Sequence, residues 1–226
     1  MFKTLINLFY PVLCTGCGEP LVTGQEVVCT ACRLQLPYLF DKIDDNNPVA
    51  RVFWGRVNFE FAGALFYFQK NSIVQSILHE FKYKNRIEIA DVFGKEIGKL
   101  IIKSDKMNYF DALVPVPLHP KKLRKRGYNQ SELLANAIAQ TVNKPVLTKV
   151  LSKKEFTETQ THKNRTDRWK NTAEKFVLES TNIPQKILLI DDVITTGATL
   201  DVCASLLHQH NPECKISAFS LAYSYR

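Results

Sequence analysis

One stretch of the sequence, KILLIDDVITTGATL at residues 186–200, constrains the fold more than any other. Its residues Ile187 to Ile190 are all apolar, which is typical of a strand that is buried on both faces of a parallel sheet. Two adjacent acids follow, and then threonines surround a single glycine before a helical pattern begins. Ligands of parallel sheets bind beyond the carboxyl ends of the strands. We therefore expect a sheet around this strand and a polar site where the strand ends.

Segments of strand character and helix character alternate in the second part of the chain. Apolar and aromatic segments predict strands at 61–69, 111–117, 187–190 and 215–222. Apolar residues at helical spacing predict helices at about 73–81, 88–103, 131–142 and 198–209. Asn129 or Ser131 is expected to cap the third of these helices. This alternation favours an α/β fold, with a mainly parallel sheet and helices on its faces.

The residues after the strand at 187–190 suit a sugar phosphate. Asp191 and Asp192 can accept hydrogen bonds from sugar hydroxyls, and the N-terminus of the next helix offers unpaired N–H groups to an anion. Gly197 permits a close approach of the backbone, and the threonines add hydroxyl donors. The loop lacks the lysine of a Walker sequence and the three glycines of a dinucleotide fingerprint. A metal site on the two acids and a capped helix without a ligand are the alternatives.

Two C-x-x-C pairs near the N-terminus predict a metal site with the ligands Cys14, Cys17, Cys29 and Cys32. Two residues between paired thiolates let both sulfurs reach one ion, and structural Zn²⁺ takes four such ligands in a tetrahedron. Eleven residues separate the pairs, a spacing that suits a compact zinc knuckle. Two disulfides or a redox C-x-x-C are the alternatives. Cys203 and Cys214 are expected to be packing residues.

The charge and the apolar segments limit the kind of partner and the location. The formal net charge of +8 favours anionic partners, either phosphorylated metabolites or nucleic acid. No apolar run approaches the roughly 18 residues that a membrane helix needs. Pro11 interrupts the apolar stretch Leu5–Leu13, and no small-residue cleavage site precedes Cys14. The protein is therefore expected to be cytoplasmic, without insertion into a membrane.

Changes in composition suggest two parts that are joined by a linker. Residues 1–40 contain the expected zinc-binding module. Residues 41–52, DKIDDNNPVARV, are mostly polar and contain a proline, as a linker would. Residues 53–226 are expected to form the α/β domain.

The stretch ILLIDDVITTGAT at 187–199 closely resembles the signature for phosphoribosyl diphosphate (PRPP) of type I phosphoribosyltransferases. The larger pattern is similar to the ComF family, competence-associated proteins in which a zinc module precedes a phosphoribosyltransferase domain. The matching segments are the four cysteines, LHEFKYKNR (78–86), VPVPLHPKKLRKRGYNQSELLA (114–135) and ETQTHKNRTDRWKNT (158–172). Tyr128 stands where the family commonly has phenylalanine, and Lys163 where it often has leucine.

The resemblance implies a hood near the site at about residues 53–72 and roles for individual residues. Asp191 and Asp192 are expected to bind the ribose 2′- and 3′-hydroxyls and to act as the catalytic carboxylates. The 5′-phosphate is expected to bind the loop residues Thr195, Thr196, Gly197, Ala198 and Thr199. Mg²⁺ would bridge the pyrophosphate and the ribose hydroxyls and so neutralise the leaving group.

Two basic segments are expected near the pyrophosphate. The segment 114–117, VPVP, leads into the loop that the resemblance implies for the pyrophosphate, and the run KKLRKRG supplies cations beside that loop. Arg124 and Arg126 are the best candidates in this run because guanidinium binds phosphate oxygens bidentately. Residues 153–171 are expected to form the mobile loop that closes over the reaction centre in type I enzymes. Its polar contacts would be Gln160, Arg165, Arg168 and Asn171. A solvated basic face and a disordered basic linker are the alternatives for these segments.

Two hypotheses of function follow. The first is a type I phosphoribosyltransferase, a glycosyltransferase that uses PRPP and an acceptor that the sequence does not identify. The second is a non-catalytic competence factor that binds single-stranded DNA through the zinc module and the basic loops. Under either hypothesis the family resemblance implies a role in DNA uptake, with proteins of the DNA-uptake machinery as expected partners.

Overall fold

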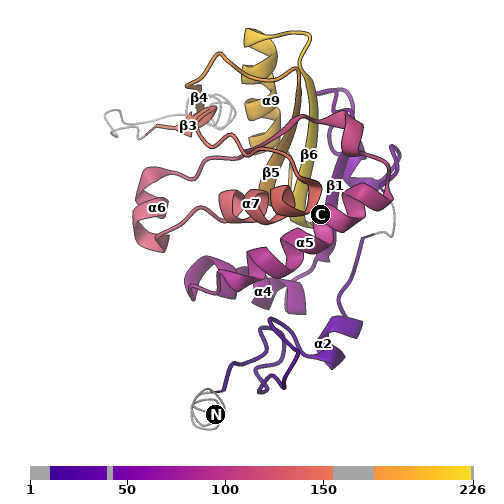
Figure 1. The fold of residues 1–226 in the computed structure, drawn as a ribbon, viewed down its shortest axis with the longest axis vertical. Coiled ribbons are helices and arrows are strands. Elements are labelled where there is room, and N and C mark those ends of the chain that lie inside the picture. The colour runs from indigo at the N-terminus through magenta and orange to yellow at the C-terminus, as the bar shows by residue number, and fades with distance from the viewer. Residues whose placement is uncertain (1–10, 40–42, 155–175, 225–226) are drawn as a thin grey trace, which may run out of the picture.

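The computed structural model describes residues 11–39, 43–154 and 176–224 (Figure 1). Its centre is a sheet with the strand order β1-β6-β5-β2, in which each neighbouring pair is parallel. The strands of this sheet are β1 (Ala62–Phe68), β2 (Ala112–Pro115), β5 (Lys186–Ile194) and β6 (Lys215–Ser224). The prediction of an α/β fold with a parallel sheet is confirmed.

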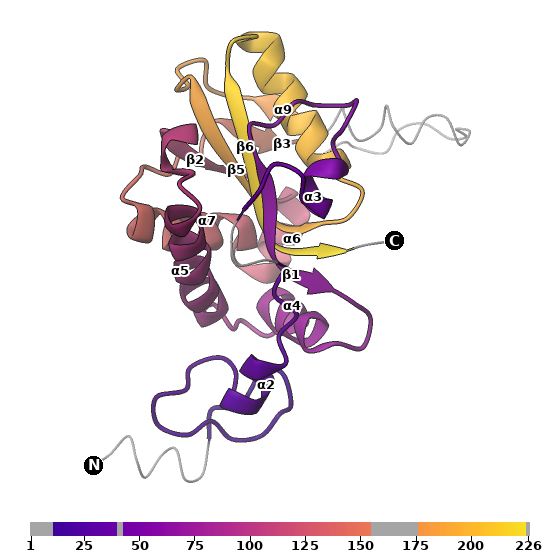
Figure 2. The ribbon, with the colours of Figure 1, turned by 90° about the vertical axis from the view of Figure 1, so that its right-hand side faces the viewer.

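Helices lie on both faces of the sheet (Figure 2). The long ones are α4 (Ile73–Tyr83), α5 (Glu88–Lys103), α7 (Gln130–Val142) and α9 (Ala198–His210). Leu188 and Ile190 share an apolar core with α4, α5 and α7, whereas Ile187 and Leu189 share the other core with α9. All four strand residues are fully buried, because consecutive side chains of a strand point to opposite faces. Within the described ranges, no helix is both long and apolar enough to cross a bilayer.

β5 is longer than the sequence pattern predicts. We expected the strand to end at Ile190, where the apolar run ends. For the edge of β5 that pairs with β6, this expectation is wrong. Pairing with β2 does end there, at Pro115 opposite Ile190. Pairing with β6 continues to Ile194. The ladder continues because it joins backbone groups, and polar side chains do not interrupt it where β6 extends alongside. The two acids therefore lie within β5, just beyond the end of β2.

Shorter elements complete the described part of the chain. They are α2 (Thr30–Leu34), α3 (Pro48–Arg51), the 3₁₀ helix η1 (Met107–Tyr109), α6 (Pro120–Arg126), β3 (Leu151–Lys153) and β4 (Phe176–Leu178). β3 and β4 pair antiparallel in a separate two-stranded sheet. This pair flanks residues 155–175, which lie outside the described ranges.

α3 lies inside the segment proposed as a linker. The side chain of Asn47 caps it by accepting hydrogen bonds from the N–H groups of Val49 and Ala50. The same side chain donates to the carbonyl of Ala62 at 2.9 Å, so it also attaches this segment to β1. The division of the chain into residues 1–40, 41–52 and 53–226 stays a prediction.

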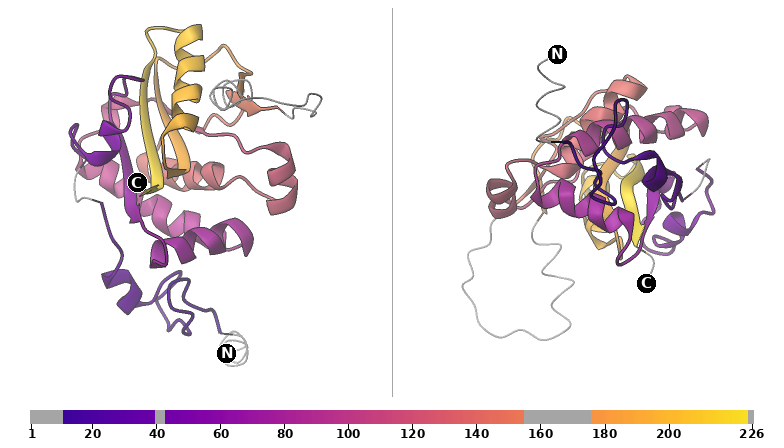
Figure 3. Two further views of the ribbon diagram at one scale, coloured as in Figure 1. Left: turned by 180° about the vertical axis from the view of Figure 1, so that it is seen from behind. Right: turned by 90° about the horizontal axis from the view of Figure 1, so that it is seen from below.

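The cysteine-bearing segment 11–39 packs against α4 and α5 at one end of the molecule (Figure 3). Val27 and Val28 are buried in the same apolar cluster as Val74 of α4 and Ile97 of α5. Burying apolar area that would otherwise face water stabilises the fold. The segment is therefore an extension of the main core on that face of the sheet.

Candidate functional site

Asp191 and Asp192 meet side chains from two helices. Ser131, at the start of α7, donates its hydroxyl to Asp191 Oδ1 at 3.2 Å. The backbone N–H of Asp192 donates to the same oxygen at 2.8 Å. Lys82, in the last turn of α4, places its Nζ 2.7 Å from Oδ2 of Asp192. The two carboxylates therefore have different partners, and among the residues that the structure describes only Asp192 has an ion-pair partner.

The surroundings of Asp191 favour its protonated form. Burial and the negative charge of Asp192 raise the pKa of Asp191 to about 7, although the N–H of Asp192, the ammonium of Lys82 and the hydroxyl of Ser131 act in the opposite direction. Protein surrounds the carboxyl, but one side of the residue lines a small cavity. The carboxyl of Asp191 is therefore harder to ionise than an ordinary carboxyl, although it borders a cavity.

This cavity, of about 40 Å³, joins Asp191 to the loop at the start of α9. It is lined by Asp191, Val193, Ile194, Thr195, Thr196, Gly197, Ala198, Thr199 and Leu200. The structure thus brings one of the two predicted acids together with all five predicted phosphate-loop residues. Asp192 adjoins them in β5, although it does not line the cavity.

Gly197 shapes the loop at the start of α9. Its φ of +74° lies in the left-handed region, and it offers no side chain to cap the helix. A Cβ at this position would also lie 2.5 Å from Cε1 of Phe53. The N–H of Ala198 makes only a long contact of 3.5 Å, to Thr196 Oγ1. The first turn of α9 therefore presents N–H donors to the loop, as an anion site needs.

Arg56 holds this loop from the segment expected to be the hood. Its Nη1 donates to the carbonyl of Thr196 at 2.7 Å. Its Nη2 forms an ion pair with Asp201, in the first turn of α9, and the side chain of Asp201 is only 10% exposed. Sequence reasoning missed both residues. Asp201 carried a weak signal, because an acid in the first turn of a helix interacts favourably with the helix dipole, but Arg56 carried none.

The basic run forms α6, and one of its predicted phosphate ligands lies near α4. Arg126 donates to Oε1 of Gln130 at 2.9 Å, and its guanidinium lies 5.2 Å from the centre of the Tyr83 ring. The side chain of Arg124 is exposed on α6. His119 accepts a hydrogen bond from a backbone N–H at the start of α6, which is a capping role. The residues Gln160, Arg165, Arg168 and Asn171 lie outside the described ranges.

Two hydrogen bonds fasten the segment 116–129, which contains α6. Asn129, the cap of α7, donates its amide to the carbonyl of Val116 at 3.0 Å. Tyr128 donates its hydroxyl to the carbonyl of Phe81 in α4. That hydroxyl is absent in the phenylalanine expected there from the family pattern. The segment expected to meet the pyrophosphate is therefore attached to the end of α4 that carries Lys82.

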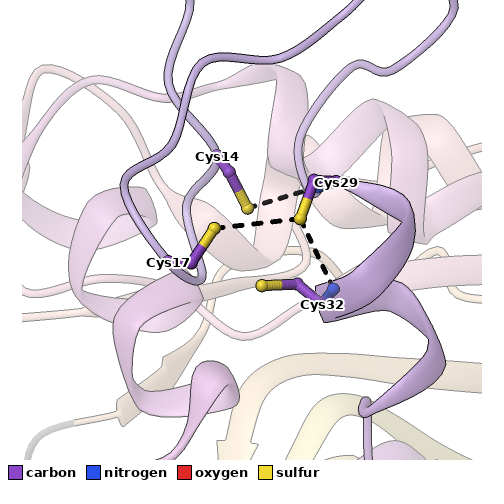
Figure 4. A group of neighbouring side chains, drawn as sticks. All are labelled: Cys14, Cys17, Cys29 and Cys32. Atoms are coloured by element: carbon purple, nitrogen blue, oxygen red, sulfur yellow. Dashed lines mark hydrogen bonds between the residues drawn. The ribbon is translucent and has the colours of Figure 1, made fainter.

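The four cysteines of the N-terminal segment converge (Figure 4). The sulfur atoms of Cys14, Cys17, Cys29 and Cys32 all lie within 4.8 Å of one another. The sulfurs of Cys17 and Cys29 are 3.8 Å apart, the spacing of two ligands of a tetrahedral ion with metal–sulfur bonds of about 2.3 Å. None of the four forms a disulfide. This donor set fits a metal such as zinc.

Backbone N–H groups point at the sulfur atoms and tune their charge. Burial raises the pKa of Cys14, but N–H donors, among them those of Cys29 and Gly16, outweigh it and lower the value to about 6. Burial and the neighbouring thiols raise the pKa of Cys32. Only a thiolate binds a metal well, so Cys14 is ready for this role at neutral pH. Cys203 and Cys214 are buried in the core beside α9.

Residues 128–224 match the family model described as phosphoribosyl transferase domain. A crystal structure of adenine phosphoribosyltransferase from Leishmania tarentolae also aligns with 81% of this chain and 77% of its own. The identity is 13% and the TM-score 0.34, too low to carry an argument about function.

Curated relatives extend the comparison. The "Competence protein ComFC" of Bacillus subtilis is 31% identical over 157 residues, which cover 68% of this chain and 61% of the relative. The "Competence protein F" of Haemophilus influenzae is 28% identical over 65% of this chain and 66% of the relative. The "DNA utilization protein YhgH" of Salmonella typhimurium is 29% identical over 58% and 59%. The alignments thus span about three fifths to two thirds of these relatives. Because they agree with the domain match and with the clustered cysteines, the chain belongs to the ComF family.

Proposed function

We propose that the protein binds PRPP where β5 meets α9 and transfers its phosphoribosyl group to a nitrogen nucleophile. One observation carries the proposal: a single cavity is lined both by a carboxylate, Asp191, and by the phosphate loop at the N-terminus of α9. Acceptors for sugar hydroxyls and donors for a phosphate are thereby placed side by side. A ribose 5-phosphate has the matching groups at its two ends.

The residues have distinct tasks in this mechanism. Thr195 to Thr199 and the first N–H groups of α9 hold the 5′-phosphate, while Asp191 and Asp192 hold the ribose hydroxyls. As the diphosphate departs, positive charge develops on the sugar ring, and fixed carboxylates nearby stabilise it. The carboxylates also suit a hard cation that is held through the ribose hydroxyls, and Mg²⁺ when bound neutralises the leaving diphosphate. Arg124 and Arg126, together with Gln160, Arg165 and Arg168, are proposed contacts of that diphosphate.

The cysteine cluster is proposed to hold a structural Zn²⁺. Four sulfur ligands fill a tetrahedral site and leave no open position for a substrate. The cluster also packs into the core beside α4 and α5, as a structural site does. This module therefore takes no part in the chemistry.

The names of the relatives point to DNA, and we propose a cytoplasmic role in DNA uptake in cooperation with proteins of the uptake machinery. A direct contact with single-stranded DNA is the second candidate function. It is favoured by α6, which exposes Lys121, Lys122, Arg124 and Lys125, and by the neighbouring Tyr83, whose ring is exposed beside Arg126. Cations that follow a backbone and an aromatic ring for stacking are what single strands bind.

Calorimetric titration with PRPP, with and without Mg²⁺, tests the main proposal. The variant Asp191→Asn/Asp192→Asn should lose affinity for PRPP by at least about a hundredfold, since both acceptors of the ribose are weakened. The control Asp91→Asn/Asp111→Asn changes the net charge equally at two exposed acids and should bind as the wild type does. A folded wild-type protein that does not bind PRPP would refute the proposal.

The same protein preparations also test the second candidate function, the binding of single-stranded DNA. Single-stranded DNA binding should survive the Asp191→Asn/Asp192→Asn substitution, because carboxylates near phosphates do not favour it. Charge reversal at Lys121, Lys122 and Arg124 should flatten the dependence of DNA affinity on salt concentration. If DNA affinity and its salt dependence stay unchanged, α6 is not the DNA contact.

A further inference from the structure

The ion pair of Lys82 with Asp192 is the starting point. The Nζ of Lys82 lies 2.7 Å from Oδ2 of Asp192, and the two side chains are only 23% and 18% exposed. A partly buried pair of this kind is screened less by water and salt than a pair on the surface. In the free protein, Lys82 is therefore a strong partner for the carboxylate that the proposed function assigns to the ribose.

Lys82 lies between the acids and the segment 116–129. The residue before it, Phe81, accepts the hydroxyl of Tyr128 with its carbonyl. The residue after it, Tyr83, lies under the guanidinium of Arg126. The end of α4 therefore contacts β5 through Lys82 and the α6 segment through its two neighbours. This ammonium group therefore lies where the acids and the segment with α6 approach the same end of α4.

The charges at this position restrict how a ligand can bind. A sugar diphosphate is strongly anionic, and two adjacent carboxylates repel it. The ammonium of Lys82 offsets this repulsion while it is paired with Asp192. When ribose hydroxyls donate to Asp192, they take over the place of one N–H donor of Lys82. The ammonium can then donate hydrogen bonds to phosphate oxygens. Such charge-assisted hydrogen bonds are short and strong.

Building on the proposed function, we infer that Lys82 exchanges partners, pairing with Asp192 in the free protein and with the diphosphate of PRPP in the complex. This makes Lys82 a specificity residue that distinguishes the 1-diphosphate from ribose 5-phosphate. It also couples the binding of the diphosphate to the binding of the ribose. When the diphosphate holds the ammonium of Lys82, that ammonium no longer competes with the ribose hydroxyls for Asp192.

The test compares two ligands, PRPP and ribose 5-phosphate, by calorimetry in the presence of Mg²⁺. Lys82→Met removes the charge and keeps most of the side-chain volume, whereas Lys82→Arg keeps the charge. Lys84→Met is the matched control, because it removes the same charge from an exposed side chain two residues further along. Circular dichroism of each variant checks that the fold is intact.

Lys82→Met should weaken PRPP binding by about tenfold or more and change ribose 5-phosphate binding by less than about threefold. Lys82→Arg should recover much of the PRPP affinity, and Lys84→Met should match the wild type. An equal loss of affinity for both ligands would overturn the inference, since Lys82 would then only position Asp192. Unchanged PRPP binding by Lys82→Met would overturn it too. Neither result refutes the proposed function, which fails only if the wild type does not bind PRPP.

Discussion

The cysteine module and the acidic site are both clusters of ionisable side chains, but they are assembled in different ways. The four sulfurs come from one short segment, residues 14–32. The acidic site combines β5 with Lys82 of α4, Ser131 of α7 and Arg56, which are far apart in the sequence. Spacing along the chain is enough to reveal the first cluster. The second exists only once the topology has brought its parts together.

The surroundings of the two clusters also shift the pKa values of Cys14 and Asp191 in opposite directions. Backbone N–H groups surround Cys14 and lower its pKa to about 6, so that a thiolate is ready for a cation. Burial and a neighbouring carboxylate raise the pKa of Asp191 to about 7, so that its charge is costly until something compensates it. Under the proposed function, an ion that stays closes the cysteine module, whereas a ligand that binds and leaves completes the acidic site. Three experiments test this contrast.

Removal of the metal should have the largest effect. Apparent metal-binding free energies of zinc modules are about 10–16 kcal/mol, and this free energy is folding free energy. Because Val27 and Val28 share their apolar cluster with α4 and α5, chelation should lower the melting temperature of the whole chain by more than about 10 °C. Thermal unfolding with and without a chelator, together with measured zinc content, checks this. An unchanged melting temperature in zinc-free protein would show that the module is independent of the core.

Arg56→Met should have the next largest effect and act on the acidic site. It leaves the buried carboxylate of Asp201 without its cation and the carbonyl of Thr196 without its donor, at a cost of about 3 kcal/mol. Urea unfolding measures the loss. Arg51→Met, at an exposed arginine at the end of α3, is the control and should cost less than about 0.5 kcal/mol. Equal effects of the two substitutions would mean that the loop does not depend on Arg56.

The pH dependence of stability should show an effect that, for each pH unit, is the smallest of the three and belongs to Asp191. Its folded pKa of about 7 lies above its ordinary value, so the folded state binds the proton more tightly than the unfolded state between about pH 4 and 7. The free energy of unfolding therefore falls as the pH rises through this window, by up to about 1.4 kcal/mol per pH unit, and levels off above it.

Urea unfolding at about pH 5, 6, 7 and 8 measures this slope. Asp191→Asn should flatten it, because the amide does not titrate. Asp111→Asn, at an exposed acid, should keep the slope of the wild type. A slope that survives Asp191→Asn would assign the titration to another group.

The sequence predicted the fold well because its signals were periodic. The helix expected at 88–103 is α5 with those same bounds, and the apolar run 187–190 is buried on both faces of the sheet. The end of β5 was missed for a physical reason. Hydrophobic residues indicate which part of a strand the helices cover. The hydrogen bonds between β5 and β6 join backbone groups, so the pairing continues past Asp191 and Asp192 although their side chains are polar.

The partners of the acids could not be found in the same way. Ser131 was a candidate cap of α7, but Asn129 takes that role, which leaves the serine hydroxyl for Asp191. Lys82 lay within a segment that resembled the family, yet one lysine among several gives no sign of where α4 ends. Arg56 follows no periodic pattern at all. Contacts of this kind depend on the crossing of elements, which one sequence does not encode locally.

The strand order β1-β6-β5-β2 also determines when the protein can fold during its synthesis. β1 is made first of the four strands, but the strand beside it, β6, is made last of the four. Until then β1 and β5 have no strand between them, and the nascent chain exposes edges that invite aggregation. All four cysteines, by contrast, are in place once residue 32 has been made, so the proposed metal can bind while the rest is still being made. A ribosome that stops before residue 215 thus releases a chain that has the whole cysteine cluster but lacks the strand that joins β1 to β5.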